Sequence, residues 1–239
     1  MSSQPTRRAI TCLAGLIGLG LAASAEAILI NEIRIDQPGA DRDEYFELAG
    51  LGGESLDGLS YLVVGDSRRG KSGVIESVTR LDGLRIADDG LFLVAEDSFT
   101  LAATVDLVAE LNFENGDNVT HLLVRDFSAR NGDDLDRDDD GLLDSTPWSE
   151  ILDGLALIAS PGGGDKTYSE TILTGLNGNA PAHAYREGTQ QTWRAGNMSI
   201  GGDTAGRSNT ALEVPEPGTL ALLAAGLLGW RHRSRQGHR

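Results

Sequence analysis

The stretch LINEIRIDQPGADRDEYFELAG, residues 29–50, contains the pattern that decides the fold. Four isoleucines at its beginning suit a strand that enters a hydrophobic core: Ile28, which directly precedes the stretch, Ile30, Ile33 and Ile35. The turn-forming run QPGADRD follows, and alternation in YFEL then puts Phe46 and Leu48 on one face of a second strand. Short strands joined by a Gly/Asp-rich turn are typical of an all-β protein.

Short apolar runs separated by turn-forming residues continue along the chain. They predict strands at residues 28–35, 45–48, 59–64, 74–81, 91–94, 119–127, 151–159 and 168–173. DSFTLAATVDLVAEL (residues 97–111) instead predicts a short helix that begins at Asp97 or Ser98. Strands at this spacing predict a β-sandwich rather than βαβ units.

The two ends of the chain differ from its body. Residues 1–27 have a basic start, an apolar run and the small-x-small pattern Ala25-Glu26-Ala27, and these predict a secretory signal peptide. We expect one domain at residues 28–205, a linker at 206–213 and a sorting segment at 214–239. The linker is predicted because the composition turns to Gly, Ser, Thr and Asn from residue 201 onward.

The body is strongly acidic. The formal net charge of the chain is -16, but 14 basic and 34 acidic residues lie between Ile28 and Val214, which gives the body about -20. Such a body repels nucleic acid and anionic lipid surfaces, so cations or sugars are the favoured partners. The alternative is that the charge serves only the solubility of an exported protein. The single cysteine, Cys12, lies in the predicted signal peptide, so we expect no disulfide or thiolate metal site in the mature chain.

Four short motifs resemble the bacterial lamin-tail domain. They are Asn31-Glu32, the acid-aromatic-acid run from Glu44 to Glu47, the turn at residues 55–58, and the run DGLF at 89–92. The resemblance is clear over residues 28–97 and looser to about residue 160. It implies an immunoglobulin-like β-sandwich that serves as a surface or interaction module, without a catalytic domain.

DDLDRDDDGLLD, residues 133–144, packs seven aspartates into twelve positions. Asp136, Asp138 and Asp140 give the D-x-D-x-D-G opening of a calcium loop, Leu142 offers a carbonyl, and Asp144 stands at the ninth position. The pattern departs at the twelfth position, where Pro147 replaces the bidentate acid. Calcium binding and a solvated acidic loop both remain open; if calcium binds, we expect it to stabilise the structure.

Enzyme motifs find little support. GDSRRGKS (residues 65–72) matches the phosphate-binding loop, but the following VIESVTRL predicts a strand where that loop requires a helix. Neither a G-x-S-x-G elbow nor an H-E-x-x-H motif occurs. A carboxylate pair that cleaves a glycosidic bond stays open as an alternative, because acidic residues are plentiful.

The C-terminal segment VPEPGTLALLAAGLLGWRHRSRQGHR (residues 214–239) reverses the charge of the body. Its apolar run at about residues 218–230 would span roughly 20 Å as a helix, which makes a short and marginal transmembrane anchor. The cluster that contains Arg231 and Arg233 favours the cytoplasmic side, so the body would lie outside the membrane.

This segment resembles the PEP-CTERM sorting signal. It has the three parts of that signal in the same order: Pro215-Glu216-Pro217, a short apolar helix and an arginine cluster. The resemblance implies processing by exosortase, a membrane-embedded transpeptidase, near the Pro-Glu-Pro triplet. It also implies bacteria that make exopolysaccharide and biofilm matrix. Besides exosortase, the partners expected are the secretion machinery and exopolysaccharide or other envelope components.

These observations lead to one main hypothesis. The chain is a non-catalytic, exported cell-surface or extracellular-matrix protein that acts by interaction or adhesion, with calcium as its candidate cofactor. The alternatives are a secreted polysaccharide-active hydrolase and a calcium-dependent glycan-binding module.

Overall fold

The computed structural model describes residues 28–67, 71–159, 162, 164, 166–175, 178–188, 191–199 and 201–209. Every regular element within these residues is a β-strand, which confirms the predicted all-β class. Across the same ranges, no helix is long and apolar enough to cross a membrane. The predicted signal peptide and transmembrane segment lie outside the described residues.

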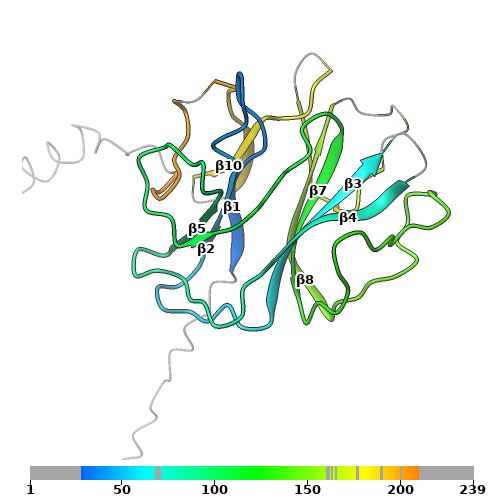
Figure 1. Ribbon diagram of the computed structural model, residues 1–239, viewed down its shortest axis with the longest axis horizontal. Helices are drawn as coiled ribbons and strands as arrows, with labels where there is room; N and C mark the ends of the chain where they lie inside the picture. Colours follow the sequence, from blue (N-terminus) through cyan, green and yellow to red (C-terminus); the bar gives the residue numbers. More distant parts are fainter. Residues whose placement is uncertain are drawn as a thin grey trace, which may run out of the picture.

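The strands form two mixed sheets, which Figure 1 shows as two layers. Sheet I has the order β11 (Thr192–Ala195), β10 (His183–Glu187), β1 (Leu29–Arg34), β2 (Tyr45–Ala49), β5 (Leu91–Ala95), β6 (Leu107–Val108). Sheet II has the order β4 (Lys71–Arg80), β3 (Leu59–Ser67), β7 (Asn118–Arg125), β8 (Glu150–Ile158), β9 (Ile172–Thr174). All pairs are antiparallel except β5 with β6 and β8 with β9.

A β-bulge in β1 explains the isoleucine spacing at the start of the domain. Strict alternation would put Ile30 and Ile33 on opposite faces of the strand. The pairing of β1 with β2 shifts register between Ile30 and Glu32, and this extra residue turns both isoleucines into the core. Asn31, Glu32 and Arg34 are also buried, but they are not part of that apolar cluster.

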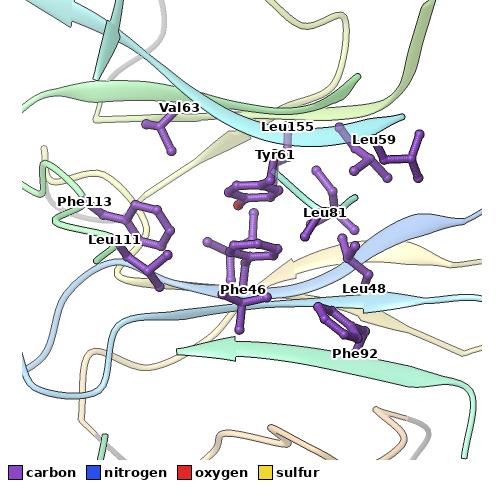
Figure 2. Packing of buried hydrophobic residues seen from close by; sticks show 14 of the residues in the cluster. Phe46, Leu48, Leu59, Tyr61, Val63, Leu81, Phe92, Leu111, Phe113 and Leu155 are labelled. Carbon is purple, nitrogen blue, oxygen red and sulfur yellow. The ribbon is translucent and has the colours of Figure 1, made fainter. Parts of the chain in front are cut away.

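The main hydrophobic core lies between the two sheets (Figure 2). Phe46 and Leu48 of sheet I meet Tyr61, Val63 and other residues of sheet II. The rings of Phe46 and Tyr61 stack with their centroids 3.7 Å apart. This shared core makes the arrangement a sandwich of two sheets.

Irregular segments cover the outer face of each sheet. On sheet II, Leu135 and Tyr168 join a second apolar cluster with Leu62, Ile75 and Leu122. On sheet I, Ala205 packs in a third cluster with Tyr45, Leu93 and Ala95, together with the loop at residues 99–105. The strands are therefore buried on both faces, which is why β7 is buried from Asn118 to Val124.

The structure differs from the sequence prediction at several elements. Residues 97–111 form turns and the short strand β6 instead of a helix, because Val94 and Ala95 of β5 pair with residues 107 and 108. Residues 206–209 of the predicted linker (206–213) and Thr204 before them are hydrogen-bonded to β1 and β2, and residues 210–213 lie outside the described residues. The predicted strand at 168–173 is reduced to β9, and β10 and β11 were missed by pattern alone.

The strand predicted after the phosphate-loop-like motif is confirmed. β4 begins at Lys71, so the motif is followed by a strand and lacks the helix that phosphate binding requires. Ser72 instead donates its hydroxyl to Asp66 Oδ1 (2.9 Å), and its backbone N–H to Asp139 Oδ1 (2.8 Å).

Candidate functional site

The acidic loop, residues 133–144, lies on the outer side of sheet II and is attached to the edge of β4. Ile75 N donates to Asp133 O (3.0 Å), and Leu135 N donates to Gly73 O (2.9 Å). The buried side chain of Leu135 fixes the loop on the apolar cluster below it. The sheet therefore provides a rigid base for the aspartates that follow.

The structure brings together three of the predicted calcium ligands. Carboxylate oxygens of Asp136, Asp138 and Asp144 all lie within 4.8 Å of one another. Asp140 is not in this group; its Oδ1 accepts the N–H of Leu142 (2.7 Å). The side chain of Leu142 is exposed, as the prediction of a backbone ligand allows.

Asp136 organises the loop. Its carboxylate accepts N–H donors from Asp140 (3.1 Å) and Gly141 (2.9 Å), and the hydroxyl of Tyr168 (2.7 Å). Burial by itself would raise the pKa of Asp136, but these hydrogen bonds and the charge of Lys166 outweigh it and lower the pKa. Asp136 is therefore held as a carboxylate in a pre-formed turn.

Asp138 is in the opposite situation. It is exposed, and its pKa is raised chiefly by the neighbouring charge of Asp140, then by desolvation and by Asp144 and Asp136. The side chain of Lys166 lies against Gly141, close enough for its charge to act on Asp136. One lysine faces several carboxylates, so the loop keeps an excess of negative charge that a divalent cation would neutralise.

A second cluster of ligand-type residues, Glu32, His183 and Asp203, is buried under the outer face of sheet I. His183 Nε2 lies 2.7 Å from Glu32 Oε1, and Thr204 donates to both oxygens of that carboxylate. Tyr45 Oη donates to Glu32 Oε1 as well. Burial alone would raise the pKa of Glu32, but His183, Thr204 and Tyr45 hold it below its ordinary value.

The Glu32 cluster already contains a cation. The guanidinium of Arg34 forms a buried ion pair with Asp203, and it also donates to the backbone oxygens of Asp36 and Met198. A metal ion at this point would meet that positive charge at close range. The cluster is therefore suited to holding residues 201–209 on β1 rather than to binding a metal.

Sequence reasoning noticed Asn31-Glu32 but missed their partners. His183 and Asp203 are 151 and 171 positions further along the chain from Glu32. Neither of them stands in a local motif, and only the pairing of β1 with β10 brings His183 to Glu32.

Among the acidic residues, Glu76 and Glu114 make direct contact. Burial, and then the charge and hydrogen bond of Glu114, raise the pKa of Glu76 to about 7. Two carboxyl groups in direct hydrogen bonding are closer than the roughly 5 Å that retaining glycosidases leave between theirs. This pair therefore lacks the spacing that glycosidic cleavage requires.

The predicted sorting and processing residues lie outside the described residues: Ala25, Ala27, Pro215, Glu216, Pro217, Arg231 and Arg233. A model of the PEP-CTERM protein-sorting motif matches residues 213–235. This match indicates an exported protein that is held at the membrane by its C-terminal region and sorted by exosortase. Comparison with curated proteins and with solved structures found no match.

Proposed function

We propose that the protein is a non-catalytic interaction or adhesion module that exosortase delivers to the cell surface or extracellular matrix. The sorting motif at residues 213–235, attached to an all-β body, is the observation that carries this proposal. The sandwich and its Asn31-Glu32 pair agree with an immunoglobulin-like, lamin-tail-like domain. Glu32 and His183 are buried and engaged in structural contacts, which favours a role without catalysis.

We also propose that the acidic loop binds calcium and that the ion stabilises the domain. The convergence of Asp136, Asp138 and Asp144 supports this, as does the hydrogen-bonded turn around Asp136. Weak, millimolar-range affinity is expected, because the bidentate acid of the twelfth position is replaced by Pro147.

A calcium titration followed by thermal unfolding tests the metal proposal. Asp138→Asn removes a charge from an exposed ligand, so it should abolish most of the calcium-dependent rise in melting temperature, with little effect in chelator. Asp88→Asn is the matched control, because Asp88 is equally exposed but lies outside the acidic loop. If about 10 mM calcium leaves the melting temperature of the native chain unchanged, the proposal that the acidic loop binds calcium is wrong.

The mass of the protein from cells with and without exosortase tests the sorting proposal. We expect the loss of the segment that follows the Pro-Glu-Pro triplet only where exosortase is present. A full-length tail in both strains would contradict processing.

A panel of polysaccharides separates the remaining alternatives. Retention without cleavage, lost on chelation, would identify a calcium-dependent glycan-binding module. Release of oligosaccharides would identify a hydrolase and overturn the non-catalytic role.

A further inference from the structure

The last described residues of the chain are held at a fixed place on sheet I. Asn209 is the last described residue, and its Nδ2 donates to the backbone oxygen of Asn31 (3.1 Å). Just before it, Gly206 N donates to Glu47 Oε2 (2.6 Å). The segment is therefore held to β1 and β2 up to its final described residue.

Only residues 210–214 separate Asn209 from Pro215. Fully extended, this stretch lets the two residues lie at most about 20 Å apart. An enzyme that processes the chain at Pro215-Glu216-Pro217 must enclose several residues on each side of the bond it cleaves. Almost no free spacer then remains between that enzyme and the folded body.

The surface at this point is hollowed, and the hollow has both an apolar part, at Ala49 and Leu91, and a polar part. Asn31, Asp89, Gln191, Arg207 and Asn209 line a pocket there, which we call the exit face. Asp89, Gln191 and Arg207 are exposed and offer a carboxylate, an amide and a guanidinium to a partner. These groups can form hydrogen bonds and ion pairs with a partner protein beside the apolar part of the hollow.

We propose that the exit face is a docking surface for the membrane-embedded processing enzyme, which contacts the folded body while the tail occupies its active site. This inference rests on the processing proposed above. The outer side of sheet I then faces the enzyme, and the enzyme holds the acidic body close to the membrane. The acidic loop covers the outer side of sheet II and points away from the membrane. Figure 1 shows residues 201–209 (orange) on the outer side of sheet I and the acidic loop, beside β4, on the opposite side of the molecule.

Site-specific photo-crosslinking in cells that carry a catalytically inactive exosortase tests the proposal. A crosslinking residue at position 207 or 191 should capture the enzyme, and one at position 139 in the acidic loop should not. Capture that is equal at positions 207 and 139, or capture of lipid alone at position 207, would overturn the docking surface.

A charge reversal gives a second, kinetic test. Arg207→Glu should slow processing about fivefold at the native spacing. It should have no effect once a spacer of about ten Gly/Ser residues follows residue 210, because the tether then reaches the enzyme without the exit face. An equal effect with and without the spacer, or none at native spacing in a variant that melts like the native protein, would contradict the proposal. If the native chain itself is not processed, the proposed function fails, and not only this inference.

Discussion

At the scale of single residues, Gly73 is the point where β4 lies closest to Asp136 of the acidic loop. It has a φ of 79°, and a Cβ built there would lie 2.5 Å from Asp136 Cβ and 2.7 Å from Asp136 N. The backbone of β4 and the organising aspartate of the loop therefore approach each other as closely as a glycine permits. The sequence marks Gly73 only as the residue after a phosphate-loop-like motif.

Gly73→Ala should destabilise the protein by about 3 kcal/mol, because the methyl group must displace the backbone of Asp136. The matched control is Gly83→Ala, whose φ is 81° but whose Cβ meets no atom within 4 Å. The control should cost only about 1 kcal/mol, for the left-handed backbone alone. Denaturant unfolding of both variants measures the difference, and equal losses would show that the contact with Asp136 is unimportant.

At the scale of elements, an irregular segment completes sheet I. The side chains of Arg34 and Glu47 point out of the main core, and residues 203–206 supply their partners. A sheet face with buried charged and polar groups requires such partners, because leaving either kind of group unpaired in the interior is costly. The segment at 201–209 is thus a structural part of the domain and fixes the place where the tail leaves it.

Asp203→Asn should loosen this segment. It leaves the buried guanidinium of Arg34 without its counter-charge, so we expect a loss of about 3 kcal/mol and faster hydrogen exchange at residues 201–209. Glu187→Gln is the control, because it removes only the exposed ion pair with Arg194 and should change stability by less than about 0.5 kcal/mol. Unchanged hydrogen exchange at residues 201–209 in Asp203→Asn would contradict the role of the Arg34–Asp203 ion pair in holding this segment.

At the scale of the whole molecule, the raised carboxyl pKa values predict an unusual dependence of stability on pH. Burial raises the pKa of Glu44 and Glu76 to about 7, and that of Glu47 to about 8. The folded state then holds protons that the unfolded state has released above pH 4.5. Its stability should therefore fall progressively as pH rises from about 4.5 to 8. Glu32, Asp136 and Asp203 have lowered pKa values, and their contribution is lost in acid.

We accordingly expect maximal stability near pH 5, with a decrease of about 2–4 kcal/mol by pH 8. Glu44→Gln should flatten part of that slope, because an amide oxygen still accepts the N–H of Phe113 but does not titrate. Glu170→Gln, at an exposed position, should leave the slope unchanged. Melting temperatures measured from pH 4 to 8 test this, and a rise in stability toward pH 8 would contradict it.

The sequence by itself determined the features that depend on neighbours along the chain. Alternating residues in YFEL and VIESVTRL form strands, and the turns between strands carry glycine and aspartate. The sorting motif is also a linear signal, and the match at residues 213–235 confirms the resemblance of the C-terminal segment to the PEP-CTERM signal.

Tertiary structure alone decided what depends on residues far apart. The bulge beside Asn31 follows from pairing with β2, and the Glu32 cluster forms because β10 and residues 203–204 return to β1. The polar composition of residues 201–209 suggested a linker, yet buried partners more than 150 residues away hold the segment in the fold. Local pattern cannot reveal this, because burial and hydrogen bonding at these positions are set by contacts that form only when the two sheets have assembled.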